Sequence, residues 1–271
     1  HAIASLVFQA CGVDEMAVKC MLEAIQNMKF FLRTAFGDSR TFAGARLRIK
    51  TQGLCQGNGA APAGWCVISI TILGAHKRKG HGAHFLAPIS AVRLHLAAIL
   101  FVDDTDLIHI NMEREETVEE AFDALQESTI NWGRLLIATG GTLKPIKCFF
   151  YLISFKWKRD GTWAYEEHHQ DESAALYVPM PDGRRVPIEH LALDAEKKTL
   201  GAEMCPTGKA CCGLMHEKAQ KWLDKAQTGK LHRRMFWFSV ERQFWPSVGF
   251  GLGSNLGSLQ ELEVALDNKK F

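Results

Sequence analysis

The chain has 271 residues, of which 47% are hydrophobic and 23% are charged. This composition excludes a disordered or collagen-like protein and is sufficient for a buried core in one or two domains. The 32 basic and 30 acidic side chains leave a formal net charge of +2, so the overall charge identifies no class of partner.

Residues 1–32 predict two helices, because apolar residues recur at helical spacing on both sides of a break at Gly12. Asp14 is placed to cap the second helix. Strict alternation over 46–50 then predicts a strand whose open face carries three cations: Arg46, Arg48 and Lys50. A glycine-rich turn follows at 52–59.

Pro62 predicts the first turn of the next helix, which runs through Leu73. The segment 76–84, rich in histidine and lysine, predicts a basic loop. Two extended runs within 92–110 then meet at Asp103-Asp104, which predicts a hairpin with both carboxylates at its tip.

A long amphipathic helix is predicted from Glu115 to about Thr139, ending at two glycines. Extended segments are expected at 147–157, 176–180 and 186–193, and further helices near 213–227 and 231–245. This order of elements predicts an α+β fold with an antiparallel sheet packed on helices.

The charges are distributed unevenly along the chain. Ten Lys or Arg residues and one acid, Asp38, lie between residues 29 and 102, and six bases without an acid lie between 129 and 159. The intervening segment is rich in acids. This pattern suits a protein that binds a polyanion and gathers cations locally, although a solvated helix face explains the Glu-rich run equally well.

The eight cysteines form no CxxC pair, and several lie among apolar residues. This usage indicates a reducing intracellular compartment, either cytoplasm or nucleus. The longest uncharged run, 51–75, has only a short strongly apolar part, 65–75, so we expect no membrane partner.

Two neighbouring carboxylates at the tip of a hairpin attract Mg²⁺, because this ion prefers oxygen ligands. Two-metal phosphoryl transfer usually needs carboxylates from at least two strands. Asp103-Asp104 alone is therefore weak support for a catalytic site, since two acids in a turn are commonly only solvated. The apolar strand 97–102 strengthens it, because it drives the acids to an edge.

Four boxes resemble those of reverse transcriptases, in the family's order. Phe101-Val102-Asp103-Asp104 resembles the YxDD box, with Phe in place of Tyr, and 56–62 (QGNGAAP) is similar to the QGxxxSP box. The segment 140–148 (GGTLKPIKC) resembles the next palm motif, and Thr199-Leu200-Gly201 resembles the primer grip. The resemblance covers roughly residues 30–271 and is nearest to retrotransposon-encoded enzymes.

The resemblance implies a partial polymerase palm over 1–205 and a helical, thumb-like region over 206–271. Asp103 and Asp104 would hold Mg²⁺, with two ions expected in the complete enzyme. Lys147 would assist the departing pyrophosphate, although an exposed strand-edge lysine is an equal alternative. The remaining implied contacts are Gln56 and Gly57 to the template–nucleotide pair, Phe101 beneath the primer end, Leu200 and Gly201 to the primer, and Arg46, Arg48 and Lys50 to phosphates.

The family's first palm motif supplies a further metal-binding Asp on a separate upstream strand, and the fingers also lie upstream. Neither Asp14 nor Asp38 fits that position. We therefore expect that this chain is the C-terminal part of a polymerase, which needs the N-terminal part of the same polyprotein and has very low activity alone.

Two other clusters have simpler explanations. His76, His81 and His84 have ligand-like spacing, but the lysines and arginine between them favour a flexible basic loop over a zinc site. The tryptophans of the terminal helices, Trp222, Trp237 and Trp245, are more often core residues than nucleic-acid contacts.

The leading hypothesis is therefore an RNA-directed DNA polymerase fragment that uses an RNA template, a DNA primer, dNTPs and Mg²⁺. The first alternative is a remnant that binds nucleic acid without turnover. The second is an unrelated metal-dependent phosphohydrolase, which would need further donors near Asp103 such as Asp106 and His109.

Overall fold

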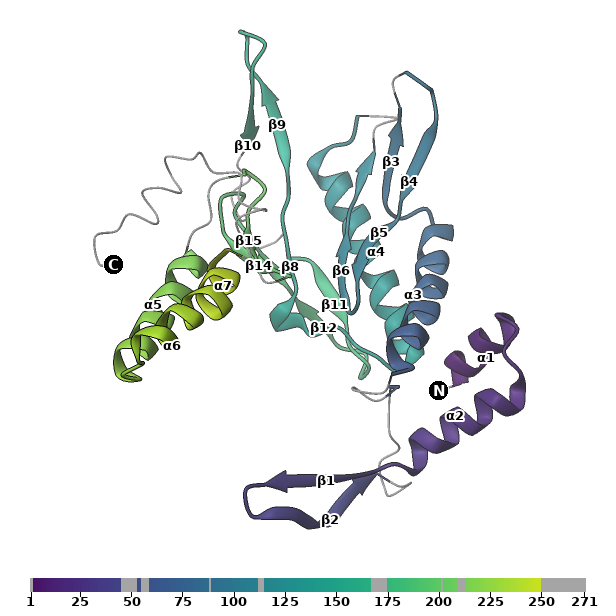
Figure 1. Cartoon of the computed structure of the whole chain (residues 1–271). Coiled ribbons are helices and arrows are strands. Elements are labelled where there is room, and N and C mark those ends of the chain that lie inside the picture. The colour runs from purple at the N-terminus through teal and green to yellow at the C-terminus, as the bar shows by residue number, and fades with distance from the viewer. Residues whose placement is uncertain are drawn as a thin grey trace. The chain divides into compact units, whose positions relative to one another are not determined.

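The structure is a computed structural model, and it describes residues 2–44, 53–54, 59–87, 89–111, 115–166, 175–200, 202–208 and 213–249 (Figure 1). Its contacts divide the chain into two compact units. The first comprises 1–149 with 172–189, and the second comprises 150–171 with 190–271. The predicted division at residue 205 stays a prediction, because these units reflect packing and not function.

The first unit begins with two helices, α1 (Ala2–Ala10) and α2 (Glu15–Asn27). Gly12, with a φ of 86°, separates them, and the Asp14 carboxylate accepts hydrogen bonds from two backbone N–H groups of α2. The prediction of two helices with this break and this cap is confirmed.

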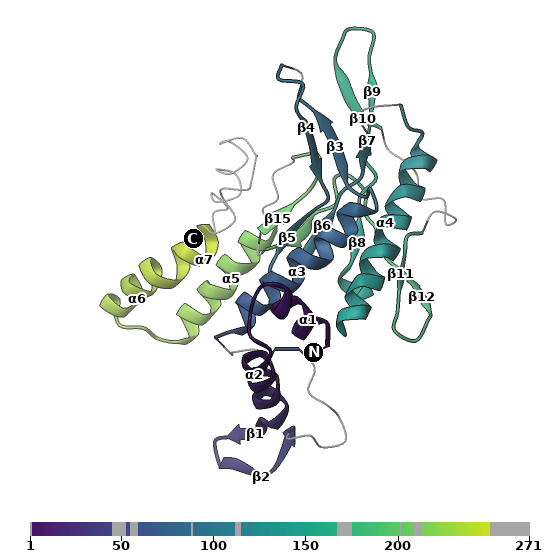
Figure 2. The same ribbon diagram turned by 90° about the vertical axis from the view of Figure 1, so that its right-hand side faces the viewer.

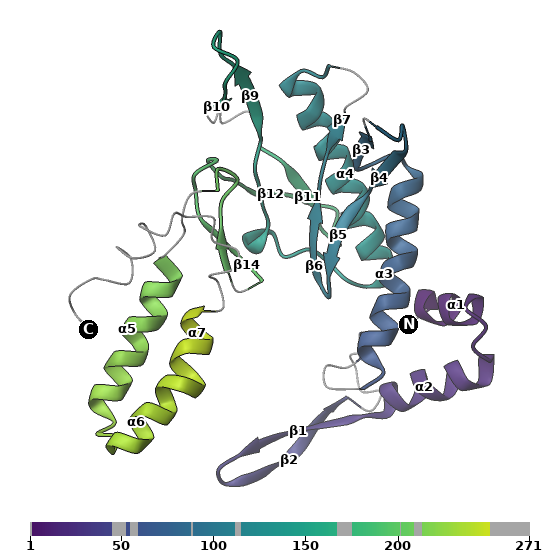
Figure 3. The same ribbon diagram turned by 45° about the horizontal axis from the view of Figure 1, so that its top comes forward.

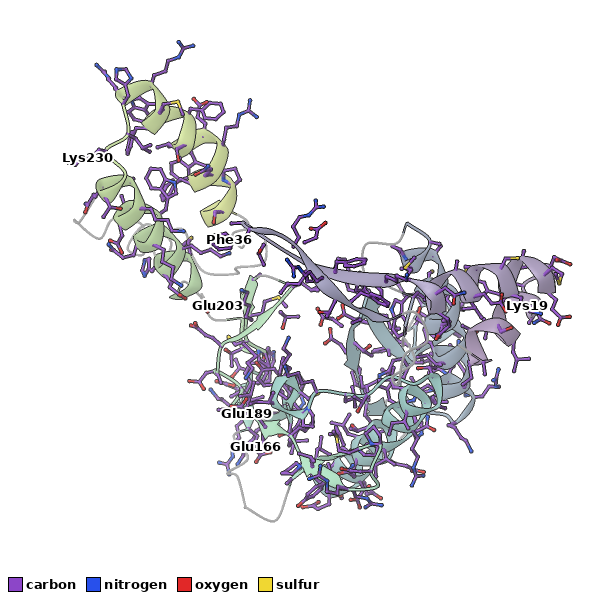
Figure 4. The ribbon with its side chains drawn as sticks, turned by 90° about the horizontal axis from the view of Figure 1, so that it is seen from below. Lys19, Phe36, Glu166, Glu189, Glu203 and Lys230 are labelled. Atoms are coloured by element: carbon purple, nitrogen blue, oxygen red, sulfur yellow. The ribbon has the colours of Figure 1, made fainter. Side chains whose placement is uncertain are left out.

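The predicted helical extent to residue 32 is wrong. A hairpin of β1 (Lys29–Thr34) and β2 (Gly37–Gly44) follows α2 directly. Gly37, with a φ of 108°, forms the turn, and the Arg33 guanidinium binds the Asp38 carboxylate across it. Figure 4 labels Phe36, which is fully exposed in the same turn.

Two long helices, α3 (Ala61–Arg78) and α4 (Val118–Thr139), pack against each other (Figure 2). Pro62 lies in the first turn of α3, as predicted. A capping box of Thr117 and Glu120 starts α4, and Gly140 in the left-handed region ends it. Of the helices in the described part of the chain, none is long and apolar enough to cross a membrane.

The strands of the first unit form small sheets. β4 (Arg93–Leu96) pairs antiparallel with β3 (Ala83–Leu86), which pairs parallel with β7 (Ile110–Asn111). The other pairs are β5 (Ala98–Phe101) with β6 (Asp104–Leu107) and β11 (Tyr177–Pro179) with β12 (Arg185–Pro187). The mixture of helices and small, mainly antiparallel sheets agrees with the predicted α+β class.

Three short elements follow α4 and β12 in the chain. The 3₁₀ helix η1 (Pro145–Lys147) precedes β8 (Phe149–Phe150), which pairs with β13 (Glu189–His190). Lys147 therefore ends a 3₁₀ turn and does not begin the extended segment expected from residue 147.

The second unit contains two hairpins and a helical end. β9 (Ser154–Trp157) pairs with β10 (Trp163–Glu166), and β14 (Lys197–Thr199) pairs with β15 (Ala202–Met204). The predicted terminal helices are confirmed as α5 (Gly213–Thr228), followed by α6 (Arg233–Ser239), a π-helical turn η2 (Val240–Phe244) and α7 (Trp245–Gly249).

A small apolar core joins the terminal helices. Met215, Ala219 and Phe244 are buried, and Trp222 packs against them. The expectation that the tryptophans are core residues holds for Trp222 alone, because Trp237 and Trp245 are each 56% exposed.

Candidate active site on the β5–β6 hairpin

The two neighbouring carboxylates lie at the tip of a hairpin, as predicted. Phe101 pairs with Asp104 across the strands, and Val102 and Asp103 form the turn between them (Figure 3). Asp103 is therefore in the turn, and Asp104 is the first residue of β6.

The hairpin has one covered face and one open face, because side chains alternate along a strand. The covered face carries the less accessible side chains Ala98, Leu100, Thr105 and Leu107. The open face carries two apolar and two acidic side chains: Ile99, Phe101, Asp104 and Asp106. Ile99 is 49% exposed and Phe101 is 60% exposed, so an apolar surface directly adjoins the carboxylates.

The hairpin turn is attached to α3. The Trp65 indole N–H donates a hydrogen bond to the Val102 carbonyl oxygen. Val102 has a φ of 56°, which is a genuine outlier for a β-branched residue and costs on the order of 1–3 kcal/mol. The indole bond helps to hold the turn that presents Asp103.

Asp106 adds a third carboxyl group near the pair. Desolvation raises its pKa above the usual range, and the negative charge of Asp104 on the same face raises it further. Asp104 and Asp106 lie on the same face of β6, so their negative charges repel each other. A cation between them would relieve this repulsion.

The chemistry of these donors fits Mg²⁺, which prefers carboxylate oxygens. A complete site needs more than the hairpin provides, since no group of three or more His, Cys, Asp or Glu side chains suited to a metal occurs among the described residues. The predicted need for a carboxylate from another strand therefore remains.

The other predicted site residues lie on separate elements. Lys147 is exposed at the end of η1 in the first unit. Leu200, with a φ of 52° and 47% exposed, lies in the β14–β15 turn of the second unit. The remaining predicted residues lie outside the described ranges: Arg46, Arg48, Lys50, Gln56, Gly57 and Gly201. The structure thus unites Phe101, Asp103 and Asp104 in one hairpin.

His109 contacts a carboxylate outside the pair. Its Nε2 lies 2.9 Å from a carboxylate oxygen of Glu116, and both side chains are largely covered. The phosphohydrolase alternative thus keeps Asp106 as a neighbour of the carboxylates, whereas His109 is committed to a different partner.

The predicted basic loop at 76–84 is wrong at both ends, because β3 already begins at Ala83. α3 continues to Arg78, and His76 is completely buried on it. The signal was present in the sequence, because Ile68, Ile72 and His76 follow one another at a spacing of four residues.

His76 is the centre of a buried polar network. Its Nε2 lies 3.2 Å from the Ser128 hydroxyl and its Nδ1 lies 2.9 Å from the Asn131 side-chain nitrogen. Trp132 packs edge-on against the ring, with 5.4 Å between centroids. Burial, together with the positive charges that His81 and His95 can carry, lowers the pKa of His76 to about 4.

Although Ser, His and Asn side chains in contact suggest nucleophilic catalysis, this arrangement does not support it. The Asn131 amide N–H donates to Nδ1, so the imidazole proton lies on Nε2 and points at the Ser128 oxygen. A base would need a free lone pair there. Ser128 is also only 2% exposed, so the network joins α3 to α4 and has no access to substrate.

Comparisons with known proteins returned no relative: no family model, no curated protein and no solved structure matches this chain.

Proposed function

We propose that this chain is part of an RNA-directed DNA polymerase of retrotransposon type, which transfers a dNTP to a primer 3′-hydroxyl on an RNA template. The observation that carries the proposal is the open face of the β5–β6 hairpin. There Asp104 and Phe101 are direct cross-strand neighbours, and the turn presents Asp103 beside them. The four sequence boxes supply the family.

The hairpin suits a substrate that has both an apolar surface and a negative charge. Phe101 offers an exposed ring that the sugar or base at a primer end would contact. Asp103 and Asp104 would hold Mg²⁺, which when bound lowers the pKa of the attacking hydroxyl and neutralises charge on the phosphates. A further carboxylate from outside the hairpin would complete the site.

The remaining roles follow the family resemblance. Lys147, exposed at the end of η1, would neutralise or protonate the departing pyrophosphate. Leu200 in the β14–β15 turn would contact the primer together with Gly201. Gln56 and Gly57 would contact the template–nucleotide pair, and Arg46, Arg48 and Lys50 would bind phosphates.

The test is primer extension on an RNA template with a DNA primer, dNTPs and Mg²⁺, by this chain joined to the N-terminal part of the same polyprotein, because we expect very low activity from the chain alone. Asp103→Asn combined with Asp104→Asn should reduce extension at least about a hundredfold, because the metal contributes several kcal/mol to the barrier. Asp123→Asn is the matched control, since it removes an exposed carboxylate from the surface of α4. Extension that survives the double change would refute the proposed site.

Metal binding gives a second readout that does not depend on turnover. Mn²⁺ added to the chain should bind more weakly after the double change than after Asp123→Asn. Binding of an RNA–DNA duplex that persists without any extension or Mn²⁺ difference would instead identify the non-catalytic, nucleic-acid-binding remnant.

A further inference from the structure

The β9–β10 hairpin carries four aromatic side chains on one face. Trp157 is paired with Trp163 across the strands, and Phe155 is paired with Tyr165. Because cross-strand partners lie on the same side of a hairpin, the four rings form one surface. The Phe155 ring lies 5.2 Å from Trp163 and 5.3 Å from Tyr165, centroid to centroid.

Much of this aromatic surface is exposed. Trp157 is 72% exposed, Phe155 53% and Trp163 49%, whereas Tyr165 is half-buried and donates its hydroxyl hydrogen bond to the Pro206 carbonyl. Cross-strand aromatic pairs stabilise a hairpin, which explains why Phe155, Trp163 and Tyr165 contact one another. This stabilisation does not explain the exposure of Trp157, whose ring is the most exposed of the four.

The same hairpin is basic near its turn. Lys156, Lys158 and Arg159 are all exposed. The acid in the turn, Asp160, accepts hydrogen bonds from the Thr162 N–H and hydroxyl, at 2.9 and 2.6 Å. Glu166, which is labelled in Figure 4, lies at the end of the hairpin away from the turn. Positive charge therefore gathers around Trp157.

We propose that the β9–β10 hairpin binds single-stranded nucleic acid, with unpaired bases stacked on the Trp157 surface and phosphates bound by Lys156 and Lys158. Exposed aromatic rings beside cations are the two elements that such binding requires. A single strand fits better than a duplex because the faces of paired bases are already stacked and closed to a ring.

The cations can reach the backbone although Lys156 lies on the opposite face from the rings. Neighbouring strands are only about 4.8 Å apart, so a two-stranded ribbon is narrow. A flexible lysine side chain therefore reaches phosphates that pass along its edge. This proposal adds a binding surface to the proposed polymerase, yet it requires none of the carboxylates of the β5–β6 hairpin.

The experiment measures fluorescence anisotropy of a labelled 20-nucleotide dT strand with the full chain, in EDTA and without dNTPs. Trp157→Ala should weaken binding about five- to a hundredfold, because stacking on an aromatic side chain is worth that much per base. Trp157→Phe should retain most of the affinity. Phe36→Ala, which removes a fully exposed ring from the β1–β2 turn, should bind like the wild type.

Salt dependence tests the cations. Lys156→Gln and Lys158→Gln should each make the plot of log affinity against log salt shallower by about 0.7, because each change removes one ion pair with a phosphate. An unchanged slope would overturn the assignment of these lysines. Circular dichroism of every variant confirms that the hairpin changes leave the fold intact.

Trp157→Ala binding dT as tightly as the wild type would overturn the proposal as a whole. If the same variant also lost a dimer in sedimentation, the aromatic face would instead be assigned to a second copy of this chain. The dT assay contains EDTA and no dNTPs, so it does not depend on metal-dependent extension, and failure of the polymerase proposal is distinguishable from failure of this one.

Discussion

Acidification should destabilise the first unit through His76. This residue is completely buried, and its pKa is lowered to about 4, chiefly by burial. In the unfolded chain an unperturbed histidine has a pKa of about 6.5. Between pH 6.5 and pH 4 the unfolded state therefore binds a proton at His76 that the folded state does not bind. The contribution of neutral His76 to the free energy of unfolding is complete above pH 6.5 and is lost as the pH falls towards 4.

The size of the effect follows from the two pKa values. The contribution lost by pH 4 and below approaches about 3 kcal/mol, and about 2 kcal/mol is lost by pH 5. This is a large fraction of the roughly 5–15 kcal/mol that is typical for the whole free energy of unfolding of a domain. Urea unfolding at pH 7.5 and pH 5.0 would measure it, with tryptophan emission as one probe and circular dichroism as another.

The comparison that isolates His76 uses His76→Gln, which cannot gain a proton but keeps an amide beside Ser128 and Asn131. The variant should be less stable than the wild type at pH 7.5, and it should lose about 2 kcal/mol less on moving to pH 5.0. His216→Gln, on the exposed surface of α5, should keep the wild-type dependence. If His76→Gln and the wild type lose the same free energy, the assignment to His76 is refuted.

Three further changes test packing, capping and the site. Gly133→Ala places a Cβ 2.7 Å from two ring carbons of Pro179, so we expect the free energy of unfolding in urea to fall by about 1 kcal/mol or more. Gly141→Ala is the control: its Cβ meets only ordinary contacts, so its free energy of unfolding should stay within about 0.5 kcal/mol of the wild type. Thr117→Ala removes the side-chain cap of α4 and should cost about 1 kcal/mol, and an unchanged unfolding midpoint would contradict that role. Trp65→Phe keeps an apolar ring but removes the N–H that binds the hairpin turn, so the free energy of unfolding should fall by about 0.5–1.5 kcal/mol. Primer extension should fall as well. Full extension activity would show that the turn does not need this hydrogen bond.

The sequence predicts best those elements whose boundaries have local chemical causes. The long helix α4 begins at Val118, three residues after the predicted Glu115, because Thr117 caps it, and it ends before Gly140, where the sequence places its stop signal. The same holds for Asp14 at the start of α2 and for Pro62 in the first turn of α3. Each of these signals acts within one turn of helix, so no knowledge of the tertiary structure is needed.

Elements whose extended form depends on pairing with another segment are predicted poorly. The sequence does not predict the β1–β2 hairpin because apolar residues at 28–32 continue the helical pattern of α2, and only the pairing with 37–44 makes the segment extended. It misses β10, β14 and β15 for the same reason. His76 is misplaced because its neighbours in sequence are basic, whereas its burial depends on α4, more than 50 residues away.

The residues of the candidate site show the same difference between local signals and strand pairing. The apolar strand that precedes Asp103 and Asp104 predicts their place at a hairpin tip, which is a local signal. The sequence suggests Asp106 only as a donor for a different enzyme. Its electrostatic coupling to Asp104 follows from the alternation of β6, which places both carboxyl groups on one face.

That alternation also explains why the carboxylates point away from the helices. A shift of one residue in the pairing of β5 with β6 would exchange the two faces. Asp104 and Asp106 would then lie on the face that now carries Ala98, Leu100, Thr105 and Leu107, and β6 contacts α4. Burying two carboxylates without partners is strongly unfavourable, and exposing apolar side chains such as Leu107 would add to that cost. The hydrophobic pattern that forms the hairpin therefore also determines that its acids remain accessible to a cation and a substrate.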